Sequence, residues 1–78
     1  MNREPGADDR FLLALWEDPE DERDARTWDY FKTITAAEDA AMHHLRGAAF
    51  NYAAIYEWNR DTDDYDIERR VIEMDDLP

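Results

Sequence analysis

The 78-residue sequence contains no cysteine and no serine, and it has only two glycines. Without cysteine the chain forms neither a disulfide nor a thiolate metal site. The side chains most often activated as nucleophiles, serine and cysteine, are missing. Gly6 and Gly47 stand too far apart to build a phosphate-binding loop. The composition therefore argues against an enzyme and predicts a binding protein.

Basic residues are also scarce, with 9 lysines and arginines against 21 acidic residues and a formal net charge of −12. Such a chain is repelled by phosphates, which argues against binding to nucleic acid or to an anionic membrane. No apolar run approaches the roughly 20 residues of a membrane span, and Met1–Asp9 lacks the apolar segment of a signal peptide. We therefore expect a cytoplasmic protein, whose charge serves either a basic partner or solubility alone.

The histidines and the aspartates do not follow metal-binding spacings. His43 and His44 are adjacent, so on a helix they point about 100° apart and do not share a metal ion. The run Arg60–Asp66 is rich in carboxylates like a calcium loop. Counted from its first aspartate, however, the sixth position is Asp66 rather than glycine, and the twelfth is Ile72 rather than glutamate. The sequence predicts no metal and no cofactor.

One helix is expected, over Thr35–Gly47. Thr35 and Glu38 have the spacing of a capping box, and Gly47 is placed to end the helix in a left-handed conformation. At about 100° per residue one face is almost entirely alanine and leucine. This face comprises Ala37, Ala41, Leu45 and Ala48. An alanine-rich face of this kind favours close packing on a sheet.

Four strands are expected, from short apolar runs and from alternation of apolar with polar residues. They are Phe11–Trp16, Thr27–Ile34, Phe50–Trp58 and Ile67–Met74. In the fourth, Ile67, Arg69 and Val71 alternate with charged residues, which is typical of an edge strand.

The resulting order β-β-α-β-β predicts an α+β fold, with a four-stranded, largely antiparallel sheet and one helix on one face. Residues 1–78 form a single domain with a loose N-terminal tail over 1–9 and a short C-terminal tail over 75–78. The acidic connections Glu17–Asp24 and Arg60–Asp66 lie at opposite ends of the sheet if the helix runs back along it. They lie at one end if the helix only crosses it.

The candidate binding surface consists of the two acidic connections. Hairpins need polar connections for solubility, but two crowded clusters in so small a domain favour contact with a basic protein groove. The candidate partner-binding residues are Glu17, Asp18, Glu20, Asp21, Glu22, Asp24, Asp61, Asp63, Asp64, Tyr65 and Asp66. Most tryptophans and tyrosines are expected in the core, packed against Leu13, Phe31, Ile55 and Val71. Tyr65 is expected to be exposed, and a surplus of aromatic surface would also suit a homodimer.

The whole chain resembles the small anti-CRISPR proteins of phages and prophages, most of all those directed at type I-C systems. The resemblance lies in the acidic, cysteine-free single domain and in the run RTWDYFKTITAAEDAAMHHLRG. It implies a protein that binds a CRISPR surveillance complex and prevents recruitment of target DNA. The alternatives are an acidic antitoxin or immunity protein that neutralises a basic partner, and a phage accessory protein that acts through dimerisation.

Overall fold

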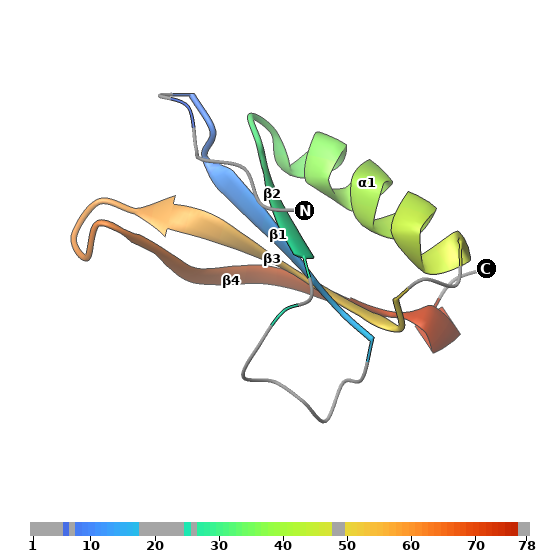
Figure 1. Ribbon diagram of the computed structural model, residues 1–78. Coiled ribbons are helices and arrows are strands. Elements are labelled where there is room, and N and C mark those ends of the chain that lie inside the picture. The colour runs from blue at the N-terminus through green and yellow to red at the C-terminus, as the bar shows by residue number, and fades with distance from the viewer. Residues whose placement is uncertain (1–5, 7, 18–24, 26, 48–49, 77–78) are drawn as a thin grey trace.

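The structure of the chain is a computed structural model that describes residues 6, 8–17, 25, 27–47 and 50–76 (Figure 1). Within them the order of elements is β-β-α-β-β, followed by a short 3₁₀ helix, η1. The bounds are β1 Phe11–Trp16, β2 Thr27–Phe31, α1 Ile34–Arg46, β3 Tyr52–Asn59, β4 Asp64–Glu73 and η1 Met74–Asp76.

The strands form one sheet in the order β2-β1-β3-β4, in which every neighbouring pair is antiparallel. Helix α1 lies along one face of this sheet (Figure 1). The predicted α+β class, with four antiparallel strands and one helix, is confirmed. The central position of β1 agrees with its continuous apolar sequence, since such a strand is buried from both sides.

The register places the two hairpin connections at opposite ends of the sheet. Trp16, the last residue of β1, pairs with Tyr52 at the start of β3, whereas Phe11 pairs with Glu57 near the end of β3. The chain therefore leaves β1 at one end of the sheet and leaves β3 at the other. Of the two arrangements that the sequence left open, the structure has the first.

The core lies between α1 and the sheet. On the helix its residues are Ala37, Ala41 and Leu45, all nearly inaccessible to solvent. The sheet supplies Leu13, Leu15, Ala53, Ile55 and Ile72. Small alanine side chains let the helix backbone approach the sheet closely, which confirms the predicted alanine face over its first three members; Ala48 lies outside the described residues.

The N-cap of the helix lies two residues before the predicted one. Thr33, not Thr35, is the N-cap: its backbone is extended, with φ −131° and ψ 153°, and its Oγ1 accepts a hydrogen bond of 3.2 Å from the Ala36 N–H. The earlier start brings Ile34 into the first turn, where it packs against the core. Glu38, which the sequence placed in a capping box with Thr35, forms an ion pair with Arg70 of β4.

The other end of the helix also differs from the prediction. Gly47 has φ −73° and ψ −3°, a right-handed conformation, and its N–H bonds to the carbonyl oxygen of His43 at 3.1 Å. Gly47 thus completes the last helical turn instead of reversing the chain. A left-handed conformation is found instead at Asp63, with φ 53°.

Strand ends differ from the prediction: β2 ends at Phe31 rather than Ile34, and β3 runs from Tyr52 to Asn59 rather than from Phe50 to Trp58. In β4 the alternation differs as well. The strand begins at Asp64, three residues before the predicted Ile67, and its register with β3 shifts twice. At the first shift Ile55 pairs with Arg70 and Tyr56 with Glu68, which leaves Arg69 as an extra residue. A bulge of this kind breaks the two-residue alternation.

The bulge also changes which side chains of β4 share a face. Val71 pairs with Ala54 on the face away from the helix, and Ile67 pairs with Glu57 on the helix side. The expectation that Ile67 and Val71 share a face is wrong, because the extra residue between them moves one of the two side chains to the other face.

Candidate functional site

The β3–β4 turn carries one of the two predicted acidic clusters. Asp61 and Asp63 lie in the turn itself, and Asp64 and Asp66 lie in the first residues of β4. All four are exposed. Aspartate tolerates the left-handed backbone found at Asp63 better than most residues do, because its short side chain bonds locally. The turn therefore presents four carboxylates on a short, tightly folded segment.

Hydrogen bonds fix the shape of this turn. The side-chain oxygen Oδ1 of Asn59 accepts from the Asp61 N–H at 2.9 Å. The Thr62 hydroxyl donates to Oδ2 of Asp66 at 2.7 Å. This bond, followed by one with Asn59, lowers the pKa of Asp66 below its ordinary value, because both favour the charged carboxylate. Asp66 is therefore fully ionised at neutral pH.

Tyr65 does not point freely into solvent as predicted. It is half-buried, and its hydroxyl donates a hydrogen bond of 2.6 Å to the carbonyl oxygen of Asp9. Its ring lies 5.1 Å from that of Trp58 and 5.3 Å from that of Tyr30, measured between centroids. Because Tyr30 belongs to the other edge strand, β2, Tyr65 holds the turn against the sheet rather than serving as a free contact residue.

The other acidic connection is described only at its first residue. Glu17 is exposed at the end of β1, and Asn51 Nδ2 donates to its carbonyl oxygen at 2.7 Å. The remaining predicted contact residues of this connection lie outside the described residues. They are Asp18, Glu20, Asp21, Glu22 and Asp24.

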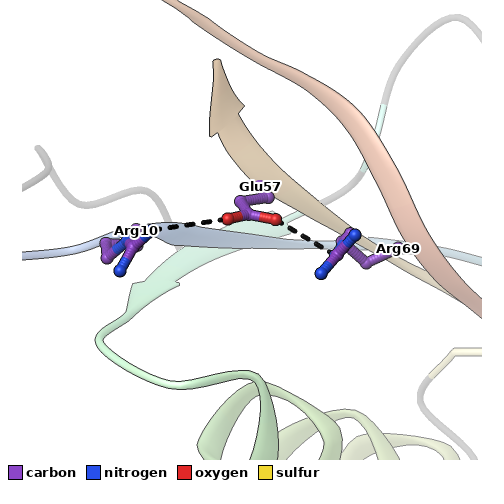
Figure 2. Close-up of polar contacts among 3 residues, drawn as sticks. All are labelled: Arg10, Glu57 and Arg69. Carbon is purple, nitrogen blue, oxygen red and sulfur yellow. Dashed lines mark ion pairs between the residues drawn. The ribbon is translucent and has the colours of Figure 1, made fainter. Parts of the chain in front are cut away.

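Arg10, just before β1, and Arg69 and Arg70 of β4 are paired within the molecule. Glu57 lies between Arg10 and Arg69, with Oε2 3.6 Å from Arg10 Nη2 and Oε1 3.1 Å from Arg69 Nε (Figure 2). Arg70 pairs with Glu38 across the helix–sheet boundary. These pairs hold the three arginine side chains at Glu57 and Glu38.

The sheet face opposite the helix is rich in aromatic residues, which the sequence analysis assigned largely to the core. The register and ring contacts place seven aromatic side chains there: Trp16, Trp28, Tyr30, Tyr52, Tyr56, Trp58 and Tyr65. The buried cluster under the helix contains no tryptophan or tyrosine among the described residues. The expected packing against Leu13, Phe31 and Ile55 is therefore wrong, because these three side chains belong to the cluster under the helix. Val71, the fourth expected partner, lies on the aromatic face.

Alternation in β3 was the signal for this arrangement. Tyr52, Ala54, Tyr56 and Trp58 follow at every second position and so share a face. Sequence alone does not say which of the two faces the helix covers, and in the structure the helix covers the face opposite the aromatic one. We name the side of the sheet away from α1 the open face.

No group of three or more His, Asp or Glu side chains suited to a metal ion occurs in the described part of the chain. None of its described helices is long and apolar enough to cross a membrane. Comparisons with protein-family models, with curated proteins and with solved structures found no match.

Proposed function

We propose that this protein is an inhibitor that binds a basic, DNA-binding protein complex through its acidic turns and keeps target DNA from the complex. The complex proposed first is a type I-C CRISPR surveillance complex. The observation that carries the proposal is the β3–β4 turn, on which Asp61, Asp63, Asp64 and Asp66 are all exposed in a chain of net charge −12. The proposal rests on charge and exposure together with the resemblance described above.

The physical basis is competition for one positively charged path. Duplex DNA carries one negative charge per about 1.7 Å of axis, and proteins that hold it present rows of lysine and arginine. Closely spaced carboxylates satisfy the same side chains and release the same counterions. Binding through such contacts weakens steeply as salt concentration rises.

The sheet provides a rigid spacer between the two acidic ends. The connection after β1 and the turn after β3 leave opposite ends of the β1–β3 ladder. A six-residue strand rises by about 3.3 Å per residue, so these ends are about 20 Å apart. In the proposed mode the two ends contact separate stretches of one basic groove.

Charge reversal at Asp61 tests the proposal. Asp61→Lys changes the net charge by two in the turn, and its side chain is exposed. Asp63 is less suitable, because its left-handed backbone makes a lysine there strained. The matched control is Asp39→Lys, which makes the same charge change at an exposed position in the middle of helix α1, outside both acidic connections.

The assay measures binding of labelled target DNA by a purified type I-C surveillance complex in the presence of each variant. Asp61→Lys is expected to raise the concentration needed for half-inhibition about tenfold, equivalent to about 1.4 kcal/mol, while Asp39→Lys has a much smaller effect. Equal effects of both variants would show that only the overall charge matters. Absence of any binding to the complex, with capture of a co-encoded basic toxin instead, would favour the antitoxin alternative.

A further inference from the structure

The open face contains a hollow of about 190 Å³ lined by Trp16, Tyr52, Tyr56 and Glu68. Its volume is below the roughly 300–1,000 Å³ typical of pockets for drug-sized ligands, so it suits a single side chain. The register places the lining residues on the open face. Tyr52 and Tyr56 are four positions apart on β3, and the residue halfway between them on the same face is Ala54.

Two small side chains separate the large ones. Ala14 of β1 pairs directly with Ala54 of β3, and both are buried beneath the surrounding aromatic rings. Trp16 stands beside Ala14 on the same face and packs edge-to-face on Tyr52, with ring centroids 5.2 Å apart and an interplanar angle of 74°. Aromatic side chains thus surround a low alanine row.

The lining has the chemistry of a site for an organic cation. The faces of tryptophan and tyrosine rings are negative and attract ammonium or guanidinium groups within about 6 Å. Glu68 pairs with Tyr56 in the β3–β4 ladder and adds a carboxylate at the edge of the hollow. Three rings and one carboxylate therefore converge on one space.

The arginines nearest in sequence to Glu68 are engaged elsewhere. Arg69 pairs with Glu57, and Arg70 pairs with Glu38 of the helix on the other face. A second copy of this chain is a poor occupant, because each copy carries a net charge of −12 and the open faces would bring like charges together. Charge complementarity points to a basic protein.

We propose that this hollow binds an arginine side chain of the partner, with the guanidinium stacked on the Tyr52 and Tyr56 rings and paired with Glu68. Arginine is assigned before lysine because its planar, weakly hydrated guanidinium both stacks on rings and bonds to carboxylates. The identity of the partner rests on the proposed function, whereas the cation site itself does not. The open face thus supplies a specific anchor, to which the acidic turns add long-range attraction.

The test uses Nα-acetyl-arginine methylamide as the probe and the corresponding citrulline compound, which is neutral and of nearly the same shape, as its control. Titration is followed by ¹H–¹⁵N NMR of the full chain. The arginine probe is expected to shift the Trp16 and Tyr52 signals saturably, with a dissociation constant on the order of 10 mM. Citrulline is expected to leave them unchanged. Equal shifts with both probes, no saturable shift, or shifts centred on Asp61–Asp66 would overturn the proposal.

Variants separate the site from general charge. Glu68→Gln is expected to weaken arginine binding about fivefold, whereas Asp75→Asn, an equal loss of charge in η1, is expected to have little effect. Tyr56→Phe retains the ring and the binding, and Tyr56→Leu removes both. Equal weakening by Glu68→Gln and Asp75→Asn, or full binding by Tyr56→Leu, would contradict the assignment.

This outcome is independent of the assay on the β3–β4 turn. If the chain binds the arginine probe but does not inhibit the surveillance complex, the cation site is supported and the proposed partner is wrong. If the chain inhibits through Asp61 but does not bind the probe, the proposed function is supported and the cation site is wrong.

Discussion

The phenolic hydroxyl of Tyr65 and the backbone carbonyl of Asp9, 56 positions apart in the sequence, are joined by a hydrogen bond of 2.6 Å. Asp9 itself closes a small turn, in which its N–H bonds to the Gly6 carbonyl at 3.2 Å and its carboxylate accepts from the Gly6 N–H at 2.8 Å. The bond from Tyr65 fastens the segment before β1 to the start of β4. It also holds the β3–β4 turn in place.

Replacing Tyr65 by phenylalanine removes this bond and keeps the ring contacts with Tyr30 and Trp58. The expected loss is about 1 kcal/mol in the free energy of unfolding, because a half-buried carbonyl loses its donor. Urea denaturation measures it. Tyr65→Leu, which removes the ring as well, should lose more. An unchanged midpoint for Tyr65→Phe would show that the bond contributes nothing net.

The N-cap of α1 offers a comparison between two threonines. Thr33→Ala removes the hydroxyl that accepts from the Ala36 N–H, and we expect a loss of about 1 kcal/mol in unfolding free energy. Thr35→Ala lies inside the first turn, is exposed and replaces a poor helix former by the best one, so it should be neutral or slightly stabilising. Thermal or urea unfolding of both variants measures the two changes in unfolding free energy. A larger loss of unfolding free energy for Thr35→Ala than for Thr33→Ala would support the capping box at Thr35 that the sequence predicts.

Sequence periodicity was sufficient for the class of the fold and for most elements. The run Phe11–Trp16 coincides with β1, and the positions of Ala37, Ala41 and Leu45 show the buried helix face. The helix start was misplaced because two threonines compete as caps, and packing of Ile34 on the core decides between them. Such a contact with distant strands is not visible in a local pattern.

The candidate site was less predictable, for two physical reasons. The bulge at Arg69 moves the side chains before it to the other face of β4. No residue type near Arg69 predicts a bulge at this position. The choice of sheet face covered by α1 depends on the whole topology, so the aromatic residues could be grouped but not placed. The hydrogen bond between Tyr65 and Asp9 joins residues 56 positions apart, so no local pattern shows it.

The ion pairs of Glu57 give a salt-dependent prediction. Its side chain is only 19% exposed and is flanked by Arg10 and Arg69 (Figure 2). Glu57→Gln should lower the free energy of unfolding by about 1 kcal/mol at low ionic strength, since both arginines lose their charged partner. The difference from the parent chain should shrink in 1 M salt, where screening acts within about 3 Å.

The control for Glu57 is Glu68→Gln, which removes an exposed carboxylate from the same hairpin. Because the chain is strongly acidic, loss of one negative charge at Glu68 should be neutral or slightly stabilising. Urea unfolding of both variants at two salt concentrations distinguishes the loss of the Glu57 ion pairs from the loss of one negative charge. A stabilising effect of Glu57→Gln at low salt would show that general repulsion outweighs these two ion pairs.

The hydrogen bond from Thr62 to Asp66 makes the β3–β4 turn sensitive to acid. The pKa of Asp66 is lowered first by Thr62 and then by Asn59, so the charged carboxylate favours the folded turn. Its contribution to stability is present above the ordinary aspartate value of 3.8 and is lost as the pH falls through the lower folded value. Thr62→Val retains a branched side chain and removes the donor, so the pKa of Asp66 should rise part of the way towards 3.8, with Asn59 still acting. Carboxyl ¹³C shifts recorded during an NMR titration report this directly, and Thr62→Ser, which keeps the hydroxyl, should leave the pKa low. If Thr62→Val titrates at the same pH as the parent chain, the hydroxyl does not set the charge of Asp66, and the turn owes its ionised state to another group.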